Sequence, residues 1–391
     1  MSASSDLVRR IEGAVQARSA SFVALISELA QLESPSDDPA AQEPVFARLA
    51  SELATMNFGT RRFPGRRSGG LLAAVPQDRA RPAPYQLLLG HVDTVWPKGT
   101  LESMPVRLVG DRLSGPGTFD MKAGLAMAVH ALGALKDLGL APTVTPVLLV
   151  NSDEEIDSVE SRATIVRFSR KADRVWVLEP GQGPSGRFKS SRPGTALYQV
   201  TVLGRASHAG LAPEEGRSAI LAMTDLVQQL DALHDPGRGI LVNVGTVSGG
   251  IRRNVVPADC RFSVDVRTRS SDDAHRMDET LRRLASTREG ISVRVEGSIE
   301  RPPFDGAAPR HQMLLERALA LASSLGLQPG HGFAGGASDG NFAALFAPTL
   351  DGMGAVGDGA HAEHEHVMVP ETIRRIMLLA LLLLEPPVRR S

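Results

Sequence analysis

At 391 residues the chain is too long for a single compact core, so two domains are expected. Its 43 basic and 44 acidic residues nearly cancel, with no long block of one sign, which argues against nucleic acid as a partner. The single cysteine, Cys260, excludes an intrachain disulfide, and nothing in the sequence requires an oxidising compartment.

The N-terminal part of the chain predicts alternating helices and buried strands. The first fifteen residues lack the apolar segment of a signal peptide, so we expect a cytoplasmic protein. Helical spacing of apolar residues predicts a helix over 5–33 and another that ends near Gly59. A third helix, with a stripe through Ala126 and Leu135, falls among continuous apolar runs that predict strands buried on both faces at 71–75, 85–89, 144–150 and 174–178.

The pattern changes after Glu179, where glycines and a proline at 181–186 indicate a linker. Residues 194–300 read as β-α-β-β-α-β, which fits a ferredoxin-like α+β unit. Its strands are predicted at 196–203, 241–247, 261–266 and 292–295, and its helices at 215–233 and 272–288. This unit would be inserted into the first domain.

The C-terminal part returns to helix and loop, with a helix over 310–325 and glycine-rich loops near 335–341 and 357–366. The longest apolar run, Ile376 to Leu384, is far below the roughly 20 residues of a membrane-spanning helix, so it predicts a buried helix and no membrane partner. We therefore predict a doubly wound, mostly parallel α/β sheet domain formed by residues 1–183 and 301–391, interrupted by an α+β domain at 184–300.

Polar residues follow the predicted strands at the edge where ligands of such sheets bind. A lone histidine two residues before an aspartate is more often a satisfied turn residue, and Asp120, just before a helix, also suits an N-cap. Taken together, however, two histidines and several carboxylates suit a pair of divalent ions bridged by one carboxylate. With no cysteine among them, they favour zinc, with cobalt or manganese as substitutes. The set comprises His91, Asp120, Glu154, Glu155, Glu179 and His361.

Short motifs in this order along the chain resemble the M20 family of metallopeptidases, closest to the glutamate carboxypeptidase (carboxypeptidase G) branch. They run from residue 90 to residue 365, and each of the metal positions holds an allowed residue. The matching stretches are Gly90-His91-Val92-Asp93-Thr94-Val95, Gly115 to Gly124, Asp153-Glu154-Glu155, Leu178-Glu179-Pro180, Gly204 to Gly210, Asn254 to Pro257, Asp265-Val266-Arg267, Gly335 to Gly340, and His361 with Glu365.

The resemblance implies a role for each residue of the metal set. His91 and Glu179 would hold one zinc ion, Glu155 and His361 the other, and Asp120 would bridge the two. Glu154 falls at the family's general base, and Asp93 would orient His91. The nearby His364 and His366 are expected to be surface residues.

The resemblance also implies a homodimer formed by the inserted domain, which would act as a lid. His208 would reach the site of the partner subunit and stabilise the oxyanion. Asn254, Arg267 and Gly336 match positions that hold the substrate carboxylate or the oxyanion. Arg187 falls where the glutamate-releasing branch carries a lysine, which keeps the charge and changes its geometry.

The expected activity is a dinuclear zinc amidohydrolase or carboxypeptidase acting on small peptides. It would cleave the amide bond before a C-terminal amino acid with a free carboxylate, with glutamate as a candidate. One alternative is an N-acyl-amino-acid deacylase with the same site. Another is a non-catalytic dimeric relative that binds amino-acid derivatives, although such a protein would have lost a ligand or the base, and this sequence has lost neither.

Overall fold

The computed structural model describes residues 5–79 and 84–388, which form two compact units. Unit 1 comprises Met1–Ser191, Gly306–Ala334 and Ser338–Ser391, and unit 2 comprises Arg192–Asp305 and Gly335–Ala337. Unit 2 is an insertion, because unit 1 is assembled from chain on both sides of it. The boundaries predicted from the sequence, at 183/184 and 300/301, fall near the ends of unit 2. The division into these domains stays a prediction.

Unit 1 is built on a six-stranded sheet in the order β1-β2-β6-β3-β7-β14. The outer pairs β1/β2 and β2/β6 are antiparallel, and β6, β3, β7 and β14 run parallel to one another. The parallel strands place their carboxyl ends along one edge of the sheet. The strands are β1 (Phe58–Phe63), β2 (Leu71–Pro76), β3 (Tyr85–His91), β6 (Thr145–Asn151), β7 (Arg174–Val177) and β14 (Thr349–Leu350).

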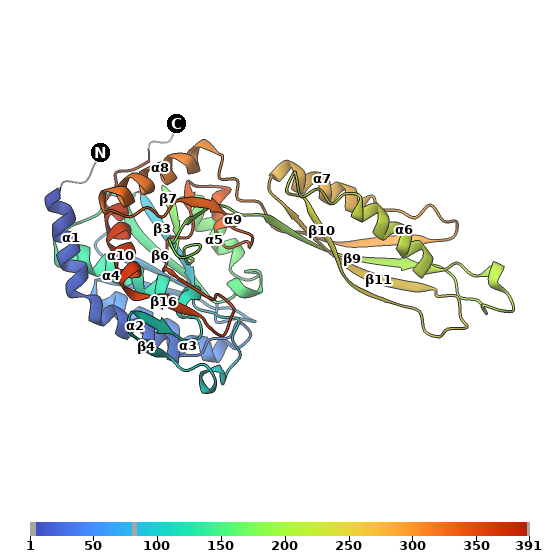
Figure 1. The fold of residues 1–391 in the computed structure, drawn as a ribbon, viewed down its shortest axis with the longest axis horizontal. Coiled ribbons are helices and arrows are strands. Elements are labelled where there is room, and N and C mark those ends of the chain that lie inside the picture. Colours follow the sequence, from blue (N-terminus) through green and yellow to red (C-terminus); the bar gives the residue numbers. More distant parts are fainter. Residues whose placement is uncertain (1–4, 80–83, 389–391) are drawn as a thin grey trace. The chain divides into compact units, whose positions relative to one another are not determined.

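Helices cover both faces of this sheet, and successive strand residues point to opposite cores. Leu88 belongs to the core under most of the helices, whereas Leu87 and Leu89 pack in a second core with helices α5 and α9. Burial on both faces explains why the strands are continuous apolar runs. Helices α1, α4 and α10 pack against one another (Figure 1). The helices of unit 1 are α1 (Ser5–Ala17), α2 (Ser19–Gln31), α3 (Pro39–Thr55), α4 (Ala123–Asp137), α5 (Arg162–Ser169), α8 (Pro309–Ser324), α9 (Gly340–Ala344) and α10 (Val369–Leu383).

The predicted helix over 5–33 is wrong in one respect, because it consists of two helices. Helix α1 ends at Ala17 and α2 begins at Ser19. The break lies at Arg18, whose Nη1 is 2.6 Å from Asp137 Oδ2. No glycine or proline marks this break in the sequence.

Two small sheets bring C-terminal segments beside earlier loops. The first has the order β15-β16-β5-β4, and β16 pairs with β5 through His366 and Ser114, so the loop before β16 lies next to the turn that follows β5. In the second, β13 runs parallel to β8. These strands are β4 (Arg107–Val109), β5 (Arg112–Ser114), β8 (Phe188–Ser191), β13 (His331–Phe333), β15 (Gly357–Asp358) and β16 (His366–Met368).

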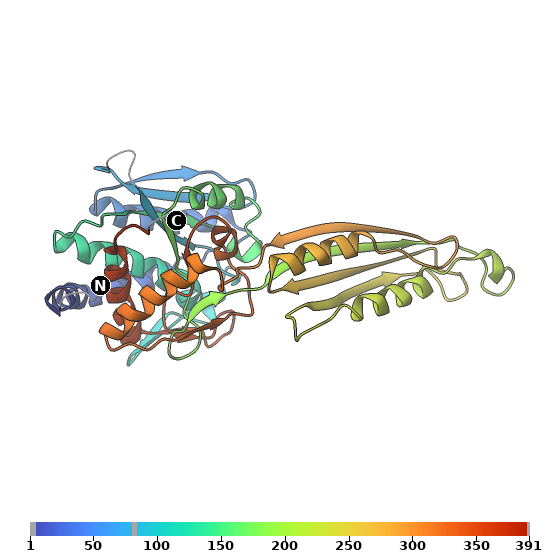
Figure 2. The same ribbon diagram turned by 90° about the horizontal axis from the view of Figure 1, so that it is seen from above.

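Unit 2 has the chain order β9-α6-β10-β11-α7-β12 and an antiparallel sheet in the order β10-β11-β9-β12. Read from the other edge, this is the fourth, first, third and second strand, the arrangement of a ferredoxin-like fold. Both helices pack into one core on the sheet (Figure 2). The predicted fold class is therefore confirmed for both units. The elements are β9 (Gly194–Leu203), α6 (Ala219–Asp231), β10 (Leu241–Gly249), β11 (Asp259–Thr268), α7 (Ser271–Arg282) and β12 (Ser292–Arg301).

Among residues 5–79 and 84–388, none of the helices has both the length and the apolar composition that crossing a membrane requires. The predicted C-terminal helix corresponds to α10, which is buried against α4 and α8.

Candidate metal centre

The carboxyl ends of three neighbouring parallel strands deliver most of the predicted metal ligands. His91 is the last residue of β3, and Glu179 follows β7. Glu154 and Glu155 form a turn after β6. Asp120 comes from a different place, the irregular turn Thr118–Lys122 that precedes α4. Because these strands are parallel neighbours, side chains distant in sequence meet at one edge of the sheet.

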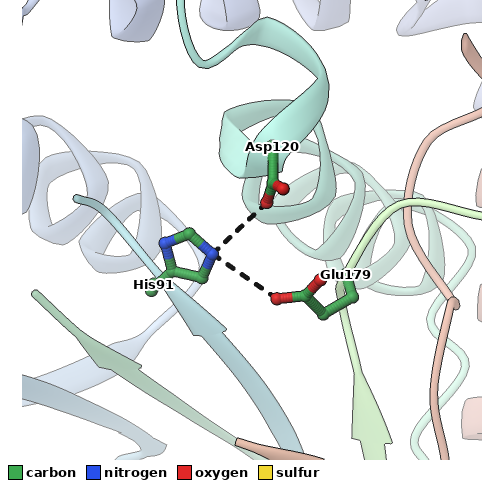
Figure 3. A group of neighbouring side chains, drawn as sticks. All are labelled: His91, Asp120 and Glu179. Atoms are coloured by element: carbon green, nitrogen blue, oxygen red, sulfur yellow. Dashed lines mark ion pairs between the residues drawn. The ribbon is translucent and has the colours of Figure 1, made fainter. Parts of the chain in front are cut away.

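Two groups of ligand-type side chains lie there, and Asp120 belongs to both. In the first group, His91 Nε2 is 3.4 Å from Asp120 Oδ1 and 3.5 Å from Glu179 Oε1 (Figure 3). In the second, His361 Nε2 is 3.5 Å from Asp120 Oδ2 and 3.1 Å from Glu155 Oε2. Each Asp120 oxygen thus faces one histidine, which is the arrangement of a carboxylate that bridges two cations.

Several polar atoms in these groups have no hydrogen-bond partner within the described part of the chain. They are buried, and they include His91 Nε2, Asp120 Oδ1 and Glu155 Oε1. A buried polar atom without a partner is costly, because it has lost its contact with water. Oxygen and imidazole nitrogen are the ligands that zinc and similar divalent ions take, so these residues fit a metal pair.

The two groups also attract positive charge. Hydrogen bonds with Asp120 and Glu155 raise the pKa of His361 to about 10. Burial alone would raise the pKa of Asp120, but the attraction of the two nearby histidines outweighs burial and lowers that pKa well below its ordinary value. The cluster therefore favours the ionised form of the Asp120 carboxylate, whereas burial raises the pKa of Glu155.

The Asp93 carboxylate contacts both His91 of the first group and the turn that carries Glu155 of the second group. Its buried carboxylate lies 3.3 Å from His91 Nδ1 and accepts a hydrogen bond of 2.8 Å from Ser36 Oγ. It also accepts hydrogen bonds from the backbone N–H groups of Glu154, at 3.3 Å, and Glu155, at 3.1 Å. Nδ1 of His91 also hydrogen-bonds with the Asp93 backbone carbonyl at 3.0 Å, so Asp93 leaves Nε2 of His91 directed at Asp120, as the residue behind a metal-binding histidine does.

Glu365 holds the Asp120 turn in place, a role that the sequence did not reveal. Its buried carboxylate accepts hydrogen bonds from the backbone N–H groups of Gly117, Phe119 and Asp120, at 2.9, 2.9 and 3.0 Å. A fourth hydrogen bond, of 2.8 Å, comes from Trp96 Nε1. Glu365 appeared in the sequence only as part of a matching stretch. Its function depends on a contact between two distant loops.

Lys189 is a second residue that sequence reasoning missed. It lies on β8, and its ammonium group is 3.4 Å from Glu179 Oε2, on the side of the carboxylate that does not face His91. It belongs to none of the motifs, and only the fold places it beside Glu179, one of the candidate metal ligands. Arg187, two residues earlier, is exposed and donates a hydrogen bond of 2.7 Å to the His331 carbonyl.

Within unit 2, His208 and Asn254 lie on neighbouring segments. The backbone of His208 pairs with that of Val255, and Ala209 N–H donates to the Asn254 carbonyl at 3.0 Å. Nδ1 of His208 accepts hydrogen bonds of 3.1 Å from the N–H groups of Gly210 and Leu211. The ring proton therefore resides on Nε2, which makes the exposed side of the imidazole a donor.

Arg267 and Gly336 also belong to unit 2. Arg267 lies on β11, where its guanidinium is 3.3 Å from Asp265 Oδ1 and donates to the Gly335 carbonyl at 3.3 Å. The Gly336 carbonyl accepts a hydrogen bond of 3.0 Å from Arg192. The Arg267 side chain is 41% exposed, so it retains N–H groups for a ligand.

A model of the peptidase family M20/M25/M40 matches residues 87–385. The chain belongs to this family. It is a hydrolase of a metallopeptidase family, and the resemblance predicted from its motifs is confirmed. Among the M20 relatives, carboxypeptidase G2 of Pseudomonas sp. (strain RS-16) is 32% identical over 345 residues, which cover 86% of this chain and 82% of that protein.

Other M20 proteins are similar over most of the chain. A succinyl-diaminopimelate desuccinylase of Alkalilimnicola ehrlichii is 26% identical over 345 residues, covering 84% of this chain and 90% of that protein. The solved structure of an aminopeptidase from Bacillus cereus has a TM-score of 0.77 at 22% identity, covering 93% of this chain and 98% of that one. An M20 metallo-carboxypeptidase from Sulfolobus solfataricus gives 0.70 at 16% identity, with the same coverage. These structures share the fold.

Proposed function

We propose that this M20 member is a dinuclear zinc carboxypeptidase, which hydrolyses the amide bond before a C-terminal amino acid with a free carboxylate. The observation that carries the proposal is the position of Asp120 between two histidine–carboxylate groups. His91 and Glu179 would hold one ion, Glu155 and His361 the other, and Asp120 would bridge them. When bound, such ions polarise a carbonyl and make water acidic enough to lose a proton near neutral pH.

Glu154 is the proposed general base. It is buried next to the ligand Glu155, and its backbone N–H is held by Asp93. It belongs to neither histidine–carboxylate group, so we assign it to proton transfer and not to metal binding. In this role it accepts a proton from the attacking water and then delivers it to the amine that leaves.

The residues of unit 2 are proposed to recognise the substrate. A guanidinium binds a carboxylate through two parallel hydrogen bonds, so Arg267 is the proposed clamp for the α-carboxylate. Asn254 and Gly336 would support it, and His208, with its proton on Nε2, would donate to the oxyanion. In unit 1, Arg187 is the proposed contact for an acidic side chain such as that of glutamate.

The proposed assembly is a homodimer formed through unit 2, with His208 acting in the site of the partner subunit. This part of the proposal rests on the family resemblance of the segment Gly204 to Gly210.

An N-acyl-amino-acid deacylase is the second candidate function. It is favoured by the similarity to a desuccinylase, which extends over 84% of this chain. Such an enzyme would use the same metal ligands and base, and its substrate would differ only in the acyl part.

A metal measurement combined with a substrate panel tests the proposal. We expect about two divalent ions per chain, with zinc restoring activity after chelation. A panel of peptidyl and N-acyl amino acids separates the two candidate functions. The measurement is which of these compounds release their C-terminal amino acid as a free amine. Full activity in metal-free protein would refute the metal-dependent mechanism, and release of amines only from succinyl or acetyl compounds would favour the deacylase.

A further inference from the structure

A cavity of about 680 Å³ lies in unit 1, away from the candidate metal centre. Residues of β1 and β2, the end of α5 and Tyr85 line it. Tyr85 begins β3 and His91 ends it, so the cavity and the metal centre lie roughly 20 Å apart along the strand. The volume falls in the range of small-molecule sites, roughly 300–1,000 Å³.

The sheet forms the floor of the cavity, and small residues on the sheet leave space there. Gly59 and Ala73 lie on adjacent strands, where they pair with Val75 and Arg61. Aromatic side chains form the wall. The rings of Phe63 and Phe168 pack edge to face with their centroids 6.3 Å apart, and the Tyr85 hydroxyl donates a hydrogen bond to the Phe168 carbonyl.

Four basic side chains line the same cavity, and no lining residue within the described ranges is acidic. The guanidinium groups of Arg61 and Arg167 lie 5.0 and 5.3 Å from the centre of the Phe63 ring. Lys171 and Arg79 complete the set. For Arg61, Arg167 and Lys171, no carboxylate within residues 5–79 and 84–388 lies at ion-pair distance.

Like charges that converge without carboxylates are stabilised by an anion with several charges. Arginine is suited to phosphate, because its planar N–H groups match two phosphate oxygens. The ring contacts hold Arg61 and Arg167 over Phe63 and leave their N–H groups without partners inside the described chain. Guanidinium groups lie over the other rings as well, Arg79 over Tyr85 at 5.1 Å and Arg167 over Phe168 at 5.7 Å, so a planar group would stack on the guanidinium faces and meet the ring edges.

We propose that this cavity binds a nucleoside di- or triphosphate, with the phosphates at Arg61, Arg167 and Lys171 and the base against the aromatic wall. This site is independent of the proposed carboxypeptidase activity. A ligand with one carboxylate would leave most of the positive charge uncompensated, and a bare polyphosphate would leave the aromatic wall in water.

Calorimetric titration with ATP tests the proposal on the full chain. We expect one saturable site per chain in wild type, and at least about tenfold weaker binding in the double variant Arg61→Ala/Arg167→Ala. The matched control is Arg66→Ala/Arg67→Ala, which removes two exposed arginines just after β1 that do not line the cavity. Unchanged hydrolytic activity in both variants would show that each is folded.

Three further titrations separate the possible sources of binding. Because ATP also binds divalent ions, it is titrated into Asp120→Asn, which should bind ATP like wild type. Adenosine and inorganic triphosphate should each bind at least about tenfold more weakly than ATP if both parts of the cavity contribute. No binding to wild type, equal binding to the Arg61→Ala/Arg167→Ala variant, loss of binding in Asp120→Asn, or equal binding of triphosphate and ATP would overturn the proposal.

Discussion

Glu154 and Glu155 are adjacent in sequence but have different surroundings. Glu155 Oε2 lies 3.1 Å from His361, whereas Glu154 belongs to neither ligand group. We expect Glu154→Gln to lower kcat at least about 100-fold, because an amide cannot accept the proton, while the metal content stays near two ions per chain. Glu155→Gln should instead lower the metal content.

Elemental analysis and steady-state kinetics on the same preparations separate these roles. If Glu154→Gln turned over substrate like wild type, the base would be another residue. If Glu155→Gln kept both ions, Glu155 would not be a ligand.

The prediction about substrate recognition concerns Arg267, the proposed clamp for the α-carboxylate. Because a charge-assisted contact at a desolvated site is worth about 2–5 kcal/mol, Arg267→Ala should lower kcat/KM roughly 30-fold or more on an acyl-glutamate. Arg267→Lys keeps the charge and loses the paired hydrogen bonds, so it should recover only part of that loss. Arg187→Ala should slow release of glutamate and leave release of alanine unchanged.

An acyl-glutamate with an amidated α-carboxylate serves as the control substrate. Cleavage of this amide by wild type at the rate of the free acid would exclude the carboxylate clamp. An Arg187→Ala variant that slowed both amino acids equally would exclude a role for Arg187 in reading the side chain.

At the residue scale, the sequence placed the strand-end residues correctly because their position follows from local pattern. The alternative reading of Asp120 as an N-cap is wrong, since α4 begins at Ala123 and the Asp120 carboxylate faces two histidines. The roles of Glu365 and Lys189 could not be predicted. Each depends on a contact between loops that no local pattern encodes.

The turn Thr118–Lys122 shows how one element depends on another. Three of the N–H groups in or just before it donate to Glu365. Glu365→Gln would place an NH₂ group against some of these donors, so we expect a loss of roughly 2 kcal/mol or more in unfolding free energy. Since the turn carries Asp120, the proposed bridging ligand, metal affinity should fall as well.

Thermal unfolding and metal titration measure both effects. Glu363→Gln is the matched control, because Glu363 is an exposed residue of the same loop and should change neither quantity. A Glu365→Gln variant with wild-type stability and metal affinity would show that the turn is held by other contacts.

At the element scale, buried elements were predicted best. The strands of the large sheet are continuous apolar runs, and the strands of unit 2 alternate between apolar and polar residues. Each pattern extends over several residues, so one exceptional residue does not obscure it. Strand β1 was missed because its sequence, Phe58 to Phe63, has large apolar residues only at its two ends, as suits an edge strand. The break at Arg18 was missed because a long-range ion pair accompanies it instead of a local helix breaker.

The homodimer gives a prediction at the scale of the whole molecule. If His208 acts in the partner's site, mixing inactive His208→Ala chains with inactive Glu154→Gln chains should restore activity. A mixed dimer contains one site with both wild-type groups, so a full statistical mixture should reach roughly a quarter of wild-type activity.

Subunit exchange has to be measured in the same mixture, for example by energy transfer between labelled chains. Exchange without recovered activity would place His208 in its own chain's site or outside catalysis. A chain that sediments as a monomer while it is active would exclude the dimer mechanism altogether.

The order of the ligands along the chain has a consequence for biosynthesis. His91, Asp120 and Glu179 leave the ribosome before unit 2 is made, whereas His361 and Glu365 follow it. At about 5–20 residues per second, the delay is on the order of tens of seconds. During that time the nascent chain contains every residue of the first proposed ligand group, but its Asp120 turn still lacks the Glu365 carboxylate that fixes it. Metal insertion is therefore expected to be a late step, completed only after translation has passed residue 365.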